Sequence, residues 1–193
     1  MIVYRIDNGI YINLTNRCSN NCSFCVRTTS KHYDEYGLWL KQEPTAKEVI
    51  AELEKAGDAD EYVFCGYGEP LYAINVLLPV AAYLKANGKK VRLNTNGQAD
   101  LIVGENVAER LKGKVDEVSI SLNAPNAKQY NEICACDFGE EGFNSLLRFA
   151  KACKNAGIAT KFSMVDTGEV DIEKAQELAD SMGIPLRVRT LIK

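Results

Sequence analysis

Strand-like and helix-like segments alternate along almost the whole chain, and this alternation constrains the fold more than any other feature of the sequence. Short segments rich in β-branched, aromatic and leucine residues predict strands, and amphipathic patterns between them predict helices. Strands that alternate with helices form βαβ units with parallel strands and right-handed crossovers. The predicted strands cover residues 9–15, 61–66, 90–95, 116–122, 159–165 and 185–192, and the predicted helices cover residues 44–57, 77–84, 142–157 and 171–182. The chain is therefore predicted to be an α/β protein with a parallel sheet.

The length of 193 residues limits the size of that sheet. At ~30 residues per βα unit the chain has room for about six units, whereas a closed eight-unit barrel typically takes ~250 residues. The sheet is therefore either an open, doubly wound one or an incomplete barrel. No low-complexity tract or Pro/Gly-rich linker divides the chain, so we expect one domain over residues 1–193. In both architectures ligands bind at the carboxyl ends of the strands.

Composition excludes several classes of protein. A net charge of −3 lacks the basic footprint of proteins that bind a nucleic-acid backbone, so such a partner is not expected. No apolar run reaches the ~18 residues of a membrane span, and residues 1–15 lack the layout of a signal peptide. We expect a cytoplasmic, reducing location, where clustered cysteines more often bind metal or do chemistry than form disulfides.

Three cysteines with CxxxCxxC spacing, Cys18, Cys22 and Cys25, directly follow the first predicted strand. A tetrahedral metal site takes four ligands. One interpretation is zinc, with His32, the only histidine of the chain, as the fourth ligand. Another is a set of buried thiols without metal. The third, which we favour, is an iron–sulfur cubane in which one iron stays open for a substrate or cofactor.

Unusual residues also follow the second and third predicted strands. The turn GYGEP, residues 66–70, contains glycines that let backbone carbonyls face a ligand, and Glu69 is an anionic acceptor for an ammonium group. An ordinary turn explains this segment equally well. The segment NTNG, residues 94–97, is either a ligand-binding loop or the turn of a hairpin.

Two later strands carry polar side chains on one face. Ser119, Ser121 and Asn123 alternate with apolar residues, which indicates either a polar barrel interior with a ligand or an exposed edge. Arg187 and Arg189 alternate with apolar residues in the last strand. They either bind a carboxylate or phosphate inside the barrel or protect a sheet edge from aggregation.

The remaining cysteines carry less information. Cys65 and Cys153 are interpreted as core thiols. Cys134 and Cys136 could ligate a second metal, but two ligands without neighbours make a poor site.

The CxxxCxxC motif, with Phe24 before its last cysteine, resembles the signature of the radical S-adenosylmethionine (radical SAM) enzymes. The resemblance implies a partial TIM-type barrel of about (βα)6. It also implies a [4Fe–4S] cluster held by Cys18, Cys22 and Cys25, with the amino and carboxylate groups of S-adenosylmethionine (SAM) on the open iron. Phe24 is then expected near the adenine.

The other motifs fit the same resemblance. GYGEP is similar to the family's GGEP motif, which holds the SAM amino group, although Tyr67 stands where the family has the first paired glycine. The third-strand loop is expected near the SAM carboxylate and ribose, and the fourth strand near the carboxylate. The implied SAM-binding residues are Phe24, Gly66, Tyr67, Gly68, Glu69, Pro70, Asn94, Thr95, Asn96, Ser121 and Asn123.

The resemblance implies an enzyme that cleaves SAM reductively to a 5′-deoxyadenosyl radical, which abstracts hydrogen from an unknown substrate. The expected electron donor is of the flavodoxin or ferredoxin type. Residues 28–42, with the rings of His32, Tyr33, Tyr36 and Trp39, are a candidate lid. The chain length and the stretch CGYGEPL resemble the small TatD-associated radical SAM group.

Other functions stay open at this point. Within the class, the chain could activate a glycyl-radical partner protein or rearrange a small anionic molecule. Outside it, the chain could be a zinc-binding structural or interaction module. An iron–sulfur electron carrier fits poorly, because carriers use four cysteines per cluster.

Overall fold

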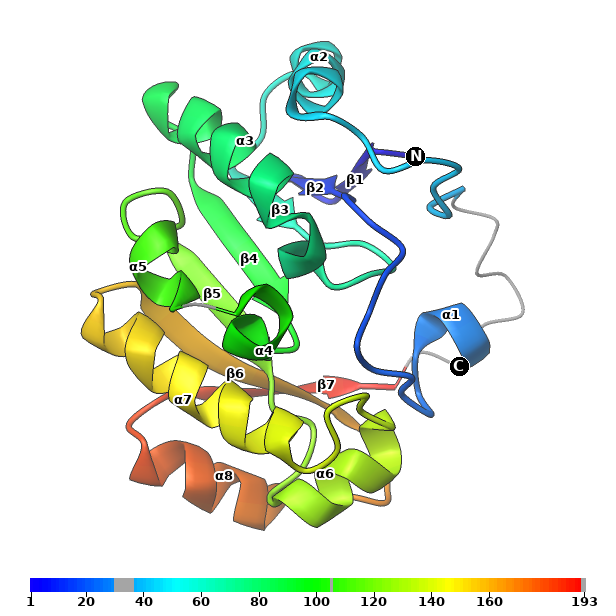
Figure 1. Cartoon of the computed structure of the whole chain (residues 1–193), viewed down its shortest axis with the longest axis vertical. Coiled ribbons are helices and arrows are strands. Elements are labelled where there is room, and N and C mark those ends of the chain that lie inside the picture. The colour runs from blue at the N-terminus through cyan, green and yellow to red at the C-terminus, as the bar shows by residue number, and fades with distance from the viewer. Residues whose placement is uncertain (30–36, 105, 192–193) are drawn as a thin grey trace.

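The computed structural model describes residues 1–29, 37–104 and 106–191 and has α/β architecture (Figure 1). One sheet contains the strands β1 (Val3–Ile6), β2 (Gly9–Ile12), β3 (Glu61–Phe64), β4 (Val91–Thr95), β5 (Glu117–Ser121), β6 (Ala159–Asp166) and β7 (Leu186–Thr190). The helices are α1 (Val26–Thr29), α2 (Ala46–Ala56), α3 (Ile74–Ala86), α4 (Ala99–Val103), α5 (Val107–Leu111), α6 (Ala127–Cys134), α7 (Glu141–Asn155) and α8 (Ile172–Ser181), and a 3₁₀ turn covers Pro70–Ala73.

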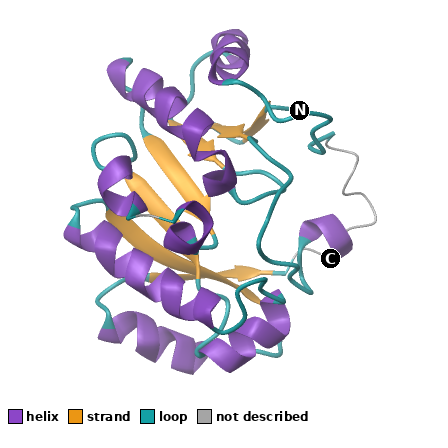
Figure 2. Cartoon of the chain, in the orientation of Figure 1, coloured by secondary structure: helices purple, strands orange, loops and turns teal. Residues whose placement is uncertain are grey.

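The order of the strands in the sheet follows their order in the sequence. Strands β2 to β7 are parallel neighbours, and β1 is antiparallel to β2. Each crossover therefore advances by one strand in one direction, as in a barrel wall, whereas a doubly wound sheet reverses its order. No described pairing joins β7 to β1, so the sheet is open. The partial barrel predicted from the sequence is confirmed, and Figure 2 shows the strands as an arc flanked by helices.

The helices cover an apolar face of the sheet. Side chains on this face come from alternate positions of the strands and have no exposed surface; they include Ile10, Ile12, Phe64, Leu93, Val118, Ile120, Phe162 and Met164. The predicted apolar stripe of α7 is buried against them, including Cys153, which confirms that this thiol belongs to the core. Helix α2 has the predicted capping box of Thr45 and Glu48. Within the described residues no helix is long and apolar enough to cross a membrane.

Three expectations need correction. Strand β1 was not predicted; it pairs with β2 through a tight turn in which Asp7 has a φ of 51°. The hairpin interpretation of residues 94–97 is wrong, because β4 leads through Gly97, with a φ of 79°, into α4. Cys65 is only half-buried and is not a member of the hydrophobic core cluster.

Candidate functional site

The cysteine loop leaves the carboxyl end of β2 and runs beside α6 toward α1 (Figure 1). Cys18, Cys22 and Cys25 are each half-buried. The loop backbone is fastened to the end of α6 on both sides of Cys22. The amide of Asn21 donates to the Cys134 carbonyl at 2.8 Å, and the amide of Ser23 donates to the Ile133 carbonyl at 2.9 Å. The sequence did not indicate this role for the end of α6.

The chemistry of the three thiols fits an iron–sulfur cluster. Burial raises the pKa of Cys18 to about 12 and also raises that of Cys25. The pKa of Cys22 is raised first by a hydrogen bond with Cys134 and then by burial. The thiols are therefore neutral without metal, and iron binding would displace their protons. Three soft sulfur donors in one loop suit iron and sulfide.

Single-ion sites require donors that converge on one point. Among residues 1–29, 37–104 and 106–191, no three His, Cys, Asp or Glu side chains do so. A cubane is compatible with this arrangement, because each thiolate binds a different iron. His32, the fourth ligand in the zinc interpretation, lies outside the described residues.

The GYGEP turn packs directly on the start of the cysteine loop. The Glu69 amide donates to the Arg17 carbonyl at 2.7 Å. A Cβ at Gly68 would lie 2.4 Å from the Thr15 carbonyl oxygen, and one at Gly66 would lie 2.0 Å from Asn13 Oδ1. Both glycines are therefore required where two loops approach each other closely.

The buried carboxylate of Glu69 connects this turn to the NTNG segment. It is 3% exposed and accepts hydrogen bonds from Thr95 Oγ1 at 2.8 Å, the Asn96 amide at 2.6 Å and the Leu71 amide at 3.2 Å. Burial raises its pKa to about 7, although these three donors oppose the shift. A carboxylate offers about four acceptor positions, so one position is left for a ligand.

A second set of hydrogen bonds connects NTNG to the cysteine loop. Asn96 Nδ2 donates to Ser19 Oγ at 2.9 Å, and Ser19 Oγ donates to Gln98 Oε1 at 2.6 Å. Gln98 Nε2 donates to Asn20 Oδ1 and to the Tyr130 hydroxyl, both at 2.9 Å. The side chains of Thr95 and Asn96, predicted as SAM contacts, thus hold loops together. Ser19, Gln98 and Tyr130 were not predicted as site residues; the only sequence signal is their position beside strand-end motifs.

The other predicted contacts are distributed around these loops. Phe24 packs against the core, Pro70 begins the buried 3₁₀ turn, and Ser121 is half-buried at the end of β5. Asn94 Oδ1 accepts from Arg92 Nη1 at 3.0 Å. Asn123 has a φ of 58° and is 4% exposed.

Asn123 has a polar atom that fits a ligand. Its Nδ2 lies 3.7 Å from Cys134 Sγ, whereas its buried Oδ1 has no hydrogen-bond partner among the described residues. A buried acceptor without a partner is costly in a native protein, and a bound donor group would satisfy it.

The described part of the candidate lid lies against the GYGEP turn. The Trp39 and Tyr67 rings are 6.5 Å apart, and the Arg27 guanidinium lies 5.5 Å from the Trp39 ring centre. Asn16 Nδ2 donates to the Leu40 carbonyl at 2.7 Å. His32, Tyr33 and Tyr36 lie outside the described residues.

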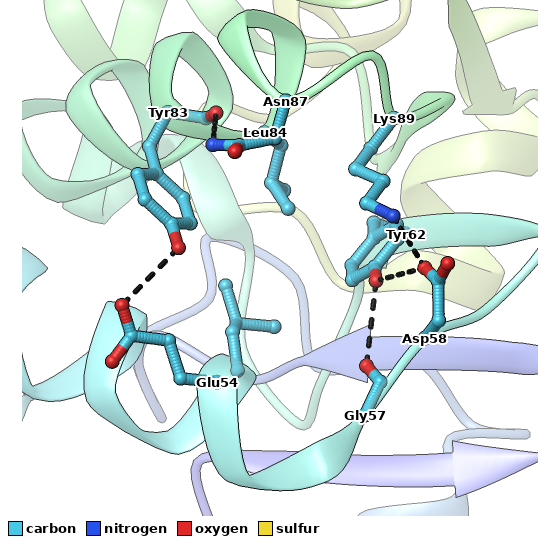
Figure 3. A pocket seen from close by; sticks show the side chains of 9 residues that line it. Glu54, Gly57, Asp58, Tyr62, Tyr83, Leu84, Asn87 and Lys89 are labelled. Atoms are coloured by element: carbon cyan, nitrogen blue, oxygen red, sulfur yellow. Dashed lines mark hydrogen bonds and ion pairs between the residues drawn. The ribbon is translucent and has the colours of Figure 1, made fainter.

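A pocket of about 330 Å³ lies at the opposite end of the sheet, before β3 and β4 (Figure 3). Its polar groups are bonded to one another. Tyr83 donates to Glu54 at 3.3 Å, Tyr62 donates to Asp58 at 3.1 Å, and Lys89 pairs with Asp58 at 2.5 Å. This pocket is far from the cysteine loop along the strands and is not the candidate site.

Two curated relatives are similar in sequence. A protein of Methanocaldococcus jannaschii, provisionally named a glycyl-radical enzyme activating enzyme, is 28% identical over 161 residues, covering 81% of this chain and 62% of that protein. GTP 3′,8-cyclase of Corynebacterium glutamicum is 29% identical over 198 residues, covering 95% of this chain and 48% of that protein. The chain thus spans 48–62% of the length of these relatives.

Solved structures share the fold. SuiB of Streptococcus suis, bound to the precursor peptide SuiA, matches with a TM-score of 0.74 at 16% identity, covering 98% of this chain and 40% of that chain. SuiB bound to S-adenosylmethionine matches with a TM-score of 0.69 at 18% identity, covering 95% of this chain and 38% of that chain.

The family model described as the radical SAM superfamily matches residues 12–182. Assignment to the TatD-associated group stays a prediction. The cofactors predicted from the sequence, a [4Fe–4S] cluster and SAM, are those of this superfamily, and its members are enzymes. Because the match includes the cysteine loop and the parallel strands β3 to β6, the chain belongs to the radical SAM superfamily.

Proposed function

We propose that Cys18, Cys22 and Cys25 hold a [4Fe–4S] cluster and that the protein uses it to cleave SAM reductively, for hydrogen abstraction from an unidentified substrate. One observation supports this most strongly. The cysteine loop, the GYGEP turn and the NTNG segment meet at the carboxyl ends of β2, β3 and β4, joined by the buried Glu69. Ligands of barrel folds bind at this end.

The chain supplies positioning, and the cofactors supply the redox chemistry. When bound, the cluster and SAM supply one-electron cleavage of a C–S bond that yields methionine and a 5′-deoxyadenosyl radical. The free acceptor position of Glu69 would take a hydrogen bond from the SAM ammonium. Asn123 Oδ1 is an acceptor, so it suits an ammonium or ribose hydroxyl better than the carboxylate expected from the resemblance.

The electron donor is proposed to be a one-electron carrier of the flavodoxin or ferredoxin type. The donor must have a potential near or below that of the cluster, because each ~59 mV of difference changes the equilibrium about tenfold for one electron.

A second candidate, within the same chemistry, is activation of a partner protein by forming a glycyl radical. The provisional name of the Methanocaldococcus jannaschii relative favours it. It predicts a complex with the partner and a radical signal on the partner that depends on SAM. No observation on the described residues favours the zinc-binding interaction module considered from the sequence. A colourless anaerobic preparation with zinc and no sulfide would nevertheless identify such a module.

The proposed function is tested by anaerobic reconstitution with iron and sulfide, reduction with dithionite and measurement of 5′-deoxyadenosine. We expect release from the parent protein and none from Cys18→Ala, Cys22→Ala or Cys25→Ala. Cys153→Ala, which removes a core thiol in α7, is the control and should retain release. Release that survives all three loop substitutions would refute the assignment of the cluster ligands.

A further inference from the structure

The face of the sheet opposite the core is polar. Residues paired in register on neighbouring strands point to the same face. The pairs Arg92↔Glu117, Ser119↔Lys161, Ser163↔Arg187 and Val165↔Arg189 therefore place these side chains together. We name this surface the open face; it contains Arg92, Asn94, Glu117, Ser119, Lys161, Ser163, Arg187 and Arg189.

Most charges on and beside the open face are neutralised by one another. Arg92 pairs with Glu61 at 2.8 Å and approaches Glu117 at 3.9 Å. Lys161 pairs with Glu117, and Lys90 pairs with Glu61 at 3.3 Å. These groups form a connected network in which every cation has a carboxylate.

Arg187 and Arg189 are different. Neither makes an ion pair or a hydrogen bond with any residue in the described part of the chain, and both are exposed. The pKa of Arg189 is lowered, first by partial burial of its guanidinium; the Cys65 thiol opposes this shift, and Arg187 and Arg92 add to it. Arg187 and Arg189 are paired in register with Ser163 and Val165, so both side chains project from β7 over the open face.

Among residues 1–29, 37–104 and 106–191, no carboxylate pairs with either of these two charges. Burial raises the pKa of the Cys65 thiol, so near neutral pH this neighbour is uncharged. Arg187 and Arg189 are two residues apart on one strand, so their Cα atoms lie about 7 Å apart. The N–H donors of each guanidinium match the oxygens of a carboxylate or phosphate. An anion bound to both side chains would reduce the electrostatic repulsion between them.

We propose that Arg187 and Arg189 bind an oxyanion, a carboxylate or a phosphate, of the substrate on the open face. This inference rests on the proposed function, because the anion would anchor a substrate beside the SAM site. Arg187 and Arg189 flank Val188, the middle residue of β7, so the anion lies beside the middle of that strand.

The test titrates inorganic phosphate and, separately, succinate into the anaerobically reconstituted full chain loaded with SAM, by calorimetry at constant ionic strength. The parent should bind at least one probe, and the stronger of the two identifies the anion. Arg187→Gln and Arg189→Gln should each weaken that binding at least tenfold. The control Arg148→Gln removes the same charge from the exposed side of α7 and should change it less than twofold. Equal binding by parent and variants, or binding of neither probe, would overturn the inference.

Release of 5′-deoxyadenosine in the absence of substrate separates the two proposals. Arg187→Gln and Arg189→Gln should release it at the parent rate and bind SAM as the parent does. If the parent and both variants release 5′-deoxyadenosine, and the variants bind the anion as the parent does, the anion site is refuted and the proposed function is not. Absence of release from the parent overturns the proposed function. A loss of SAM affinity in the variants, without a loss of anion binding, would also refute this inference, because the arginines would then serve the cofactor.

Discussion

At the scale of single residues, the protonation of Glu69 makes the stability of the folded protein depend on pH. Its pKa is about 7 in the folded protein, against an ordinary value of 4.5, because burial disfavours its charge. The folded state therefore binds this proton more tightly than the unfolded state does. The stabilisation is complete below pH 4.5 and is lost as pH rises through 7.

We predict that the parent loses stability relative to Glu69→Gln as pH rises from about 4.5 to 7. Urea unfolding of both proteins at several pH values measures the difference, in which other titrating groups largely cancel. Glu109→Gln, at an exposed glutamate of α5, serves as the control for the loss of one carboxylate. A difference between Glu69→Gln and the parent that does not change with pH would contradict the raised pKa of Glu69.

Gly68 is predicted to be essential for the fit between two loops. An alanine Cβ would meet the backbone oxygens of Thr15 and Arg17 at 2.4 and 2.5 Å, and overpacking of this kind costs about 1–3 kcal/mol. Gly68→Ala should therefore displace the cysteine loop and lower the iron content after reconstitution. Gly113→Ala, where the added Cβ meets nothing within 4 Å, strains only the backbone and should load iron normally. Equal iron content in the two variants would contradict this role.

The sequence identified motifs at single residues but not their hydrogen-bond partners. Glu69 and Asn96 were found because they lie in motifs after strands. The bond from Ser19 to Gln98 joins residues 79 positions apart, and that from Gln98 to Tyr130 spans 32. Such partners are brought together by the fold, so a local pattern cannot indicate them.

At the scale of elements, α6 braces the cysteine loop. The carbonyls of Ile133 and Cys134, at its end, accept from amides on both sides of Cys22. Its first turn depends on Asn126, whose Oδ1 accepts from the Gln129 amide at 2.9 Å. Weakening the start of α6 should therefore loosen the cysteine loop.

We predict that Asn126→Ala costs about 1 kcal/mol of stability and speeds hydrogen exchange at the Asn21 and Ser23 amides. Thr45→Ala removes the corresponding cap from α2 and should cost about the same. It should leave exchange at those two amides unchanged, because α2 makes no described hydrogen bond to them. Similar exchange in both variants would show that α6 does not brace the loop.

Elements with strong local signals were predicted well. Helix α2 has both a capping box and a terminal glycine, and α7 has four turns of apolar periodicity. Helices α4 and α5 have five residues each. A helix this short contains too few positions for its period to be recognised.

At the scale of the whole molecule, the two faces of the sheet differ in composition. The apolar face and its helices form the core, whereas the open face carries charges. The sequence indicated both faces through alternation in β5 and β7. The sequence did not indicate which of the two faces packs against the helices in each strand. That choice depends on the pairing register between strands, which is determined only in the assembled sheet.

We predict that Phe149→Ala, in the fully buried face of α7, lowers the free energy of unfolding by about 3–5 kcal/mol. Val188→Ala, at a side chain 40% exposed on β7, should cost less than about 1 kcal/mol. Urea unfolding of the protein before reconstitution measures both. Similar costs would mean that the core lies elsewhere.

The central claim is that three cysteines hold a cluster with one iron open to SAM. Electron paramagnetic resonance of the reduced, reconstituted protein tests it most directly, with SAM carrying ¹⁵N in its amino group. We predict a paramagnetic signal that changes when SAM is added and that shows hyperfine coupling to the labelled nitrogen. A signal that SAM leaves unchanged, without such coupling, would contradict the account.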